Sequence, residues 1–321
     1  MFSILGFGLY SAYVQFSGTD PLKIDPKALI LSAVSSDETV QIVDKVFGFK
    51  LPDNIAGKNM PIIPNSAIDQ SANQKTQAKN TLFSFMLIAD SHNENSYLEK
   101  ALSQAKTGKS NLAFVIGLGD YTQVGTIEEL QAAKKELDKN SLRYFVVPGD
   151  HDHWDARNKQ LESTTNFKQV FGVNYQSFIF QGIKFILIDN SDNYKGVDTE
   201  QLKWLENELE NTKTNQKDLK SILVFVHTPL SHPSSDHVMG RVEKELRHQA
   251  RNLSILFKEY GVRKVFAGDV HFFTDYTDSE TGLDMMTIGA AASQRNTQAP
   301  RFAIVNVYDD GNISVEDMEI R

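Results

Sequence analysis

Cysteine is absent from the 321 residues of this sequence, and basic residues are in the minority. Without cysteine there is no disulfide, no thiolate nucleophile and no cysteine-ligated zinc site. Any metal ion must therefore be bound by aspartate, glutamate, histidine, asparagine or glutamine. Lysine and arginine together number 33 against 41 acidic residues, which gives a formal net charge of −8 at pH 7. This balance argues against an extended nucleic-acid surface, because such a surface usually needs a basic face.

The sequence also lacks internal repeats of the length that builds solenoids. Hydrophobic residues make up 40% of the chain and charged residues 23%, a composition that predicts a packed globular core rather than disorder. The length allows one large α/β domain with extensions, or two domains of ordinary size.

A run of about 20 apolar residues, as a membrane-spanning helix needs, is missing from the N-terminus, but a shorter run is present there. Residues 2–16 read FSILGFGLYSAYVQF and carry no charge, yet they lack the basic start and the cleavage site of a secretory signal. We expect residues 1–16 to be a signal-anchor or a truncated signal; the alternative is a strand or helix packed on the domain. The first expectation implies membrane anchoring through residues 2–16 and an extracytoplasmic protein, anchored or secreted. Otherwise the protein is cytoplasmic.

Residues 17–80 are expected to form an N-terminal extension and linker, because their last part, PIIPNSAIDQSANQKTQAKN, opens with two prolines and then turns polar. From residue 81 to residue 321 the pattern changes to alternating strands and helices, which predicts one domain. Strands are predicted at 82–89, 112–118, 143–148, 176–180, 183–188, 221–226, 263–267, 271–276, 284–289, 301–308 and 312–317. Helices are predicted at 94–106, 126–139, 198–210 and 241–260. Gln181-Gly182 predicts a hairpin between two of the strands, and the whole pattern favours mixed sheets flanked by helices.

Five of the strongest apolar runs are each followed by aspartate or histidine residues. The residues at these ends are Asp90-Ser91-His92, Gly119-Asp120, Gly149-Asp150-His151-Asp152, His227 and Gly268-Asp269-Val270-His271. Each one alone is most simply a turn former or a helix cap. Together they predict a shared site, because functional residues gather at the carboxyl ends of strands in α/β sheets. Several carboxylates buried together are very unfavourable without cations, so the pattern indicates a centre with two metal ions.

The order of these motifs resembles that of the calcineurin-like metallophosphoesterases, whose pattern is Asp-x-His, Gly-Asp, Gly-Asn-His-Asp/Glu, His and Gly-His-x-His. The resemblance covers residues 81–321 and implies an α/β fold, a four-layer α/β/β/α sandwich of two mixed sheets. It also implies that Asp90, His92 and His271 bind a first metal ion. His227 is then a ligand of the second ion, and Asp120 bridges the two.

The sequence departs from this pattern at two positions, both of which fall on the second ion. Asp150 replaces the family's asparagine, and Asp269 replaces the first histidine of its last motif. If both bind metal, the site holds four carboxylates instead of two. Oxygen ligands favour harder ions, so we expect two divalent cations, with Mn²⁺ favoured and Mg²⁺, Fe or Zn²⁺ as alternatives.

The resemblance implies hydrolysis of a phosphate monoester or diester of a small phosphorylated substrate, because two metal ions can polarise a phosphate and generate a metal-bound hydroxide. His151 is the candidate for meeting the leaving-group oxygen, and Asp152, at the acidic position after it, is the second catalytic candidate. The Asp-Arg-Gly continuation of the Ser/Thr protein phosphatases is absent after Asp120, and Gln123 stands where purple acid phosphatases have a tyrosine. The chain therefore looks like the broad bacterial-type group of phosphoesterases and phosphodiesterases.

Two alternatives stay open. One is a nuclease or cyclic-nucleotide phosphodiesterase of the same fold, although the net acidity weighs against a long polynucleotide. The other is a degenerate scaffold that keeps the fold and binds partners with weak or no catalysis, which the changes at Asp150 and Asp269 allow. Candidates for substrate contacts outside the motifs are His232, His237, His153, Trp154, Arg295 and Arg301.

Overall fold

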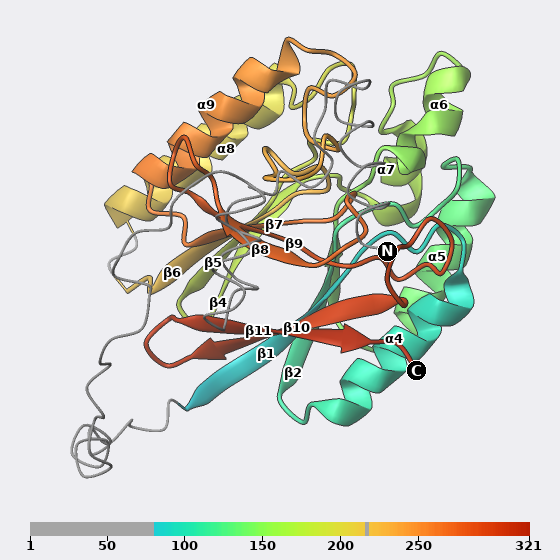
Figure 1. The fold of residues 1–321 in the computed structure, drawn as a ribbon, viewed down its shortest axis with the longest axis horizontal. Helices are drawn as coiled ribbons and strands as arrows, with labels where there is room; N and C mark the ends of the chain where they lie inside the picture. Colours follow the sequence, from blue (N-terminus) through green and yellow to red (C-terminus); the bar gives the residue numbers. More distant parts are fainter. Residues whose placement is uncertain (1–79, 216–217) are drawn as a thin grey trace, which may run out of the picture. The chain divides into compact units, whose positions relative to one another are not determined.

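The computed structural model describes residues 80–215 and 218–321. Two β-sheets lie face to face in this part of the chain, and helices cover the outer face of each (Figure 1). The fold is the four-layer α/β/β/α sandwich of two mixed sheets that the resemblance implied. The expected segment 1–16 and nearly all of 17–80 lie outside the described residues. Within the described residues, no helix has the length and apolar character needed to cross a membrane.

The first sheet has five strands in the order β11-β10-β1-β2-β3. Their bounds are Ile313–Glu319 for β11, Arg301–Tyr308 for β10, Thr81–Ile88 for β1, Leu112–Gly117 for β2 and Tyr144–Val146 for β3. β1, β2 and β3 are parallel, whereas β10 pairs antiparallel with β1 and with β11. Helices α4 (Asn95–Gly108) and α5 (Ile127–Lys139) follow β1 and β2 and cover the outer face.

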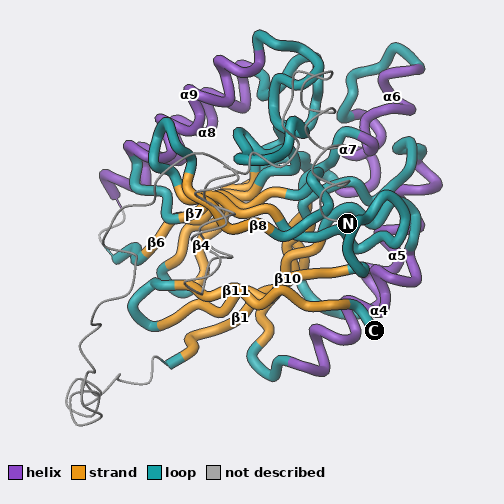
Figure 2. The backbone as a smooth tube through the Cα atoms, in the orientation of Figure 1, coloured by secondary structure: helices purple, strands orange, loops and turns teal. Residues whose placement is uncertain are grey.

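The second sheet has six strands in the order β4-β5-β6-β7-β9-β8. Their bounds are Gln176–Phe180 for β4, Ile183–Leu187 for β5, Ser221–Phe225 for β6, Lys264–Ala267 for β7, Asp284–Thr287 for β9 and Thr274–Thr277 for β8. β5, β6, β7 and β9 are parallel, and the two edge strands are antiparallel to their neighbours. Helices α8 (Thr199–Asn215) and α9 (Leu246–Glu259) lie on its outer face, opposite α4 and α5 (Figure 2).

An aromatic core fills the space between the sheets. Side chains of β1 alternate, so that Phe83, Phe85 and Leu87 face the other sheet while Met86 and Ile88 face the helices. This two-sided burial explains why the strand is apolar at nearly every position. The Phe85 ring packs against Phe114 of its own sheet at 5.5 Å between ring centroids. It also meets two rings of the opposite sheet edge-on, those of Phe185 at 5.3 Å and Phe225 at 5.9 Å.

All eleven predicted strands are present, and the predicted hairpin joins β4 to β5. Gln181 and Gly182 both have positive φ values, 48° and 82°, as a tight two-residue hairpin turn requires. Several boundaries differ, and at two elements the start moves by three residues or more. The strand predicted at 271–276 begins only at Thr274, because His271 has a left-handed backbone with φ 64°. The helix predicted at 241–260 begins at Leu246.

Three short helical segments after β3 were not predicted from the sequence. They are η1 (His151–His153), α6 (Trp154–Asn158) and α7 (Thr165–Phe171). None is long enough to show a clear helical period. The first of them matters for the site, because it carries the residues of the third motif.

Removal of the Phe85 ring is expected to destabilise the protein strongly. We expect Phe85→Ala to lower the free energy of unfolding by about 3–5 kcal/mol, because the ring is fully buried and the surrounding rings cannot close the cavity. Urea denaturation followed by circular dichroism measures the change. Ile179→Ala, at a strand position that is 46% exposed, is the control and should cost less than about 1 kcal/mol. Equal losses in the two variants would contradict this account of the core.

Candidate metal centre

The five motif-bearing strand ends meet at one edge of the sandwich. Three of them follow β1, β2 and β3 of the first sheet, and two follow β6 and β7 of the second. The site is therefore built by both sheets rather than by one run of neighbouring strands. All seven predicted metal ligands are brought together there, in overlapping groups whose ligand atoms lie within 4.8 Å of one another. These residues are Asp90, His92, Asp120, Asp150, His227, Asp269 and His271.

An unusual backbone holds these side chains in place. Asp90, His92, Asp120, Asp269 and His271 all have φ values between 43° and 64°, a region that costs energy for residues other than glycine. Hydrogen bonds between loops maintain it: the Asp90 amide donates to the Gly119 carbonyl at 3.0 Å and the His92 amide to the Asp120 carbonyl at 3.0 Å. The strained residues therefore lie in loops that are joined to one another by backbone hydrogen bonds.

Gly149 has a specific steric role next to Asp120. A Cβ atom on this glycine would lie 2.0 Å from the Asp120 Oδ1 atom and 2.3 Å from the Asp120 amide nitrogen. The His151 amide donates a hydrogen bond to the same Oδ1 atom at 3.0 Å. The glycine before Asp150 is therefore required so that the loop after β3 can approach the Asp120 carboxylate.

The first cluster contains Asp90, His92 and His271, with Asp120 beside them. The Nε2 atoms of His92 and His271 lie 3.3 Å apart. His92 Nε2 is 3.6 Å from Asp120 Oδ2, and His271 Nε2 is 3.9 Å from Asp90 Oδ1. Two imidazole nitrogens and two carboxylate oxygens thus lie close together.

The second cluster contains Asp150, His227 and Asp269, and Asp120 again contributes. His227 Nε2 is 3.5 Å from Asp120 Oδ1 and 3.7 Å from Asp150 Oδ1. This nitrogen is fully buried and has no hydrogen-bond partner. Asp120 lies between the two clusters, which is the position expected of a bridging ligand.

The tautomers of the four site histidines follow from their backbone contacts. Their Nδ1 atoms face the carbonyl oxygens of Thr122, Gln123, Leu118 and Arg295, at 3.3, 2.7, 2.7 and 3.0 Å for His92, His151, His227 and His271 in turn. A carbonyl only accepts, so Nδ1 carries a hydrogen, and Nε2 presents a lone pair to the site whenever the ring is neutral. Metal-binding histidines are commonly oriented in this way.

Burial and neighbouring charges shift the pKa values of the carboxyl and imidazole groups in the site. Burial raises the pKa of Asp90, and it raises the pKa of Asp120 well above the usual value. Burial also acts to lower the pKa of His227, but the surrounding carboxylates, Asp120 first among them, together outweigh it, and the net shift is strongly upward. For His92, burial and the neighbouring His151 lower the pKa to about 3.

Two orphaned atoms test whether metal ions fit this donor set. Asp90 Oδ2 and His227 Nε2 are both buried and lack a hydrogen-bond partner, which is unfavourable for polar atoms. A cation would satisfy both. Carboxylate oxygens and imidazole nitrogens are also the ligands that divalent transition-metal ions prefer. The residues present therefore fit two such ions.

Each carboxylate that departs from the family pattern has a partner of its own. The Asn193 side-chain amide donates to Asp150 Oδ2 at 2.8 Å, and His237 Nδ1 lies 3.4 Å from Asp269 Oδ1. Asn193 was missed by the sequence analysis, because an asparagine in a polar loop carries no signal. His237 was a candidate, and the structure places it beside Asp269.

The two catalytic candidates occupy different surroundings. His151 faces the site cavity and stacks on Trp154 at 3.9 Å between ring centroids. Asp152 is fully buried, and its carboxylate accepts hydrogen bonds from Thr122 Oγ1 at 2.7 Å and the Gly149 amide at 2.9 Å. These contacts argue against a catalytic role for Asp152, whose carboxylate instead connects the loops after β2 and β3.

A cavity of about 530 Å³ opens over the metal centre. Its walls include Trp154 and Phe272, together with the guanidinium groups of Arg241 and Arg295. Arg295 was a candidate from the sequence, whereas Arg241 was missed because nothing in its local pattern distinguishes it.

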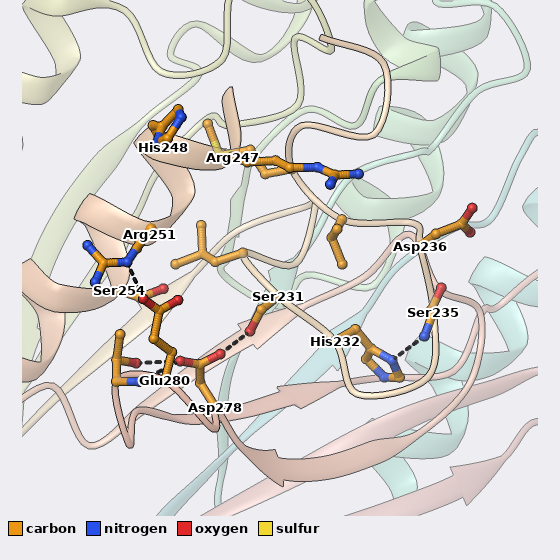
Figure 3. A pocket seen from close by; sticks show the side chains of 14 residues that line it. Ser231, His232, Ser235, Asp236, Arg247, His248, Arg251, Ser254, Asp278 and Glu280 are labelled. Atoms are coloured by element: carbon orange, nitrogen blue, oxygen red, sulfur yellow. Dashed lines mark hydrogen bonds and ion pairs between the residues drawn. The ribbon is translucent and has the colours of Figure 1, made fainter. Parts of the chain in front are cut away.

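The remaining candidates lie elsewhere. Arg301 forms an ion pair with Asp317 at 2.7 Å, and His153 is buried against Ser191. His232 lines a neighbouring cavity of about 490 Å³, which Figure 3 shows, and its Nδ1 atom accepts from the Ser235 amide. Ser235 lines both cavities, so the segment between β6 and α9 separates them.

Comparison with known proteins agrees with this geometry. A curated relative, the probable glycerophosphodiester phosphodiesterase GpdQ of Arcobacter nitrofigilis, is 31% identical over 120 residues. That match covers 36% of this chain and 41% of the relative, so the chain spans less than half of its length.

Two solved structures show the same fold. A dimetal phosphatase from Danio rerio has a TM-score of 0.55 and 19% identity over 75% of this chain and 100% of that one. The purple acid phosphatase PPD1 from yellow lupin seeds has a TM-score of 0.55 and 15% identity over 74% of this chain and 51% of its own.

A family model settles the relationship. The model described as calcineurin-like phosphoesterase matches residues 83–273, which contain every strand end of the metal centre. The chain therefore belongs to the calcineurin-like phosphoesterases.

Proposed function

We propose that this protein hydrolyses a small phosphate ester with two divalent metal ions. Asp90, His92 and His271 would hold the first ion and Asp150, His227 and Asp269 the second, with Asp120 shared between them. The observation that carries the proposal is the set of buried imidazole and carboxylate atoms that face one another with hydrogen-bonding capacity unused. Bound divalent ions supply Lewis acidity toward a phosphoryl oxygen and lower the pKa of water.

The protein's own groups then perform three tasks. Backbone carbonyls fix the four imidazoles before substrate arrives. His151 lines the cavity, and its Nε2 atom is assigned to the leaving-group oxygen. Trp154 supports that ring by stacking on it.

A diester is the favoured substrate class, and manganese the favoured metal. The partial relative from Arcobacter nitrofigilis, whose printed name specifies a phosphodiesterase, supports the first choice. The four carboxylates in the clusters support the second, since oxygen-rich sites favour harder ions. The monoester alternative is distinguished by comparing p-nitrophenyl phosphate with bis-p-nitrophenyl phosphate.

Metal content tests the ligand assignment. The full chain, stripped with a chelator and dialysed against Mn²⁺, is expected to retain about two ions per chain. Asp120→Asn should retain fewer, because Asp120 contributes to both clusters. Asp236→Asn is the matched control, since Asp236 is exposed in the neighbouring cavity. Elemental analysis of the dialysed proteins gives the counts. Wild-type protein with well under one ion, and no manganese-stimulated hydrolysis, would support the scaffold alternative instead.

Loss of the His151 ring should reduce turnover without removing metal. We expect His151→Ala to lower kcat for bis-p-nitrophenyl phosphate by about 10²–10⁴-fold, the usual contribution of a positioned acid or base. His248→Ala, which removes an exposed histidine of α9 outside the metal cavity, should be close to wild type. Steady-state kinetics and metal analysis are measured on the same samples. If His151→Ala lost metal and turnover in equal measure, His151 would be a ligand or a structural residue.

The two departures from the family pattern should determine metal preference. In the double variant Asp150→Asn with Asp269→His, the second cluster gains a nitrogen ligand and loses two charges. We expect the ratio of Mn²⁺-supported to Zn²⁺-supported hydrolysis to fall, because nitrogen ligands suit zinc better. Rates measured with each metal give this ratio. A ratio and a rate that both stay at the wild-type values would show that these two residues do not bind the second ion.

A further inference from the structure

We propose that Arg241 and Arg295 form an anion-binding pair that grips the non-bridging oxygens of the substrate phosphate above the metal centre. The inference rests on the proposed function and names the groups that make this site accept an anion. Both arginines are exposed, and both line the 530 Å³ cavity. Of the described residues, no other lysine or arginine lines it.

The two side chains reach the cavity from different segments of the chain. Arg241 belongs to the segment between β6 and α9, and its Nη1 atom donates to His237 Nε2 at 2.9 Å. His237 in turn lies 3.4 Å from Asp269, so Arg241 is on the side of the second cluster. Arg295 belongs to the loop between β9 and β10, and its Nη1 atom donates to His151 Nε2 at 3.3 Å.

Arg295 is also fixed through its backbone on the side of the first cluster. Its carbonyl accepts the hydrogen bond from His271 Nδ1 at 3.0 Å, and its φ value is 56°. The residue that orients a predicted ligand therefore also carries a guanidinium into the cavity. The loop position of Arg295 and the metal cluster are consequently coupled.

Neither guanidinium forms an ion pair with a carboxylate among the described residues. Throughout residues 80–215 and 218–321, the ion pairs include none with Arg241 or Arg295, although four carboxylates lie nearby. Each donates instead to the Nε2 atom of a histidine, a contact that uses one of its five N–H donors. The remaining donors of each fork are available to a phosphate, which guanidinium groups bind with two parallel hydrogen bonds.

The charge of the cluster gives the reason for such a pair. Four carboxylate ligands cancel the charge of two divalent ions, whereas the two carboxylates of the usual family pattern leave an excess of two positive charges. An anionic substrate entering a site with no excess gains little electrostatic attraction. Arg241 and Arg295 add two positive charges at the rim, which restores the missing excess where the phosphate oxygens would lie.

Phosphate binding tests the proposal independently of turnover. The probe is inorganic phosphate, titrated by calorimetry into the full chain loaded with Mn²⁺. In Arg241→Gln and in Arg295→Gln the Kd for phosphate should rise about tenfold or more, as expected for the loss of a charge-assisted hydrogen bond. The KM for the nitrophenyl esters should rise in parallel, and Arg→Lys variants should recover part of the loss.

Arg251→Gln is the matched control, because Arg251 is exposed in the neighbouring cavity and pairs with Glu280 (Figure 3). Its Kd for phosphate should stay within about twofold of wild type. Metal content is measured for every variant. An unchanged phosphate affinity in both cavity variants, a loss that follows lost metal, or a wild-type protein that binds metal but no phosphate would overturn the pair. Failure of the wild type to hydrolyse any ester would instead count against the proposed function, since the titration needs no turnover.

Discussion

Mutual repulsion among Asp90, Asp120, Asp150 and Asp269 is the constraint around which this end of the molecule is organised. Asp90 and Asp120 are almost completely buried, Asp150 is 8% exposed, and the side chain of Asp269 is 14% exposed. Carboxylates packed so closely in a protein interior are far less stable as anions than in water. Protons or cations must therefore be shared among them. Burial raises the pKa of Asp90 and Asp120, whereas His227 and His237 overcome burial and lower the pKa of Asp150 and Asp269 respectively.

The surrounding structure is arranged to hold this unfavourable cluster rather than to relax it. Left-handed backbone at five positions aims the side chains inward, and Gly149 lets one loop approach another closely enough to confine the Asp120 carboxylate. Asp152 supports the same loops through hydrogen bonds to Thr122 and Gly149. The core between the sheets, where large aromatic side chains pack across both layers, supplies the stability that offsets the unfavourable free energy of this cluster. Stability elsewhere permits strain at the site.

Most strands and helices were predictable from periodic patterns, whereas the four-layer fold and the ligand set were implied by the resemblance of the motif order to the calcineurin-like metallophosphoesterases. Apolar strands followed by Asp or His can be recognised in the sequence, and the five strand ends do converge in the structure. The sequence could not separate His151 from Asp152, since adjacent residues in a short helical turn point in different directions. It also missed Asn193 and Arg241, which lie in irregular loops where no period links residue type to position. Their roles arise from tertiary placement beside Asp150 and His237.

The origin of the ligands in two separate layers has a mechanical consequence. Asp90 and His92 extend from the first sheet, whereas His271 extends from the second, after β7. A cation held by all three would link the two sheets at one rim. At the opposite rim, the Lys220 Nζ atom donates a hydrogen bond to the Asp309 carbonyl at 2.9 Å. Removal of the metal would then loosen the contact between the sheets at the rim that holds the cation. Backbone amides at the carboxyl ends of β1 and β7 would exchange with solvent faster than those at the amino ends of the same strands.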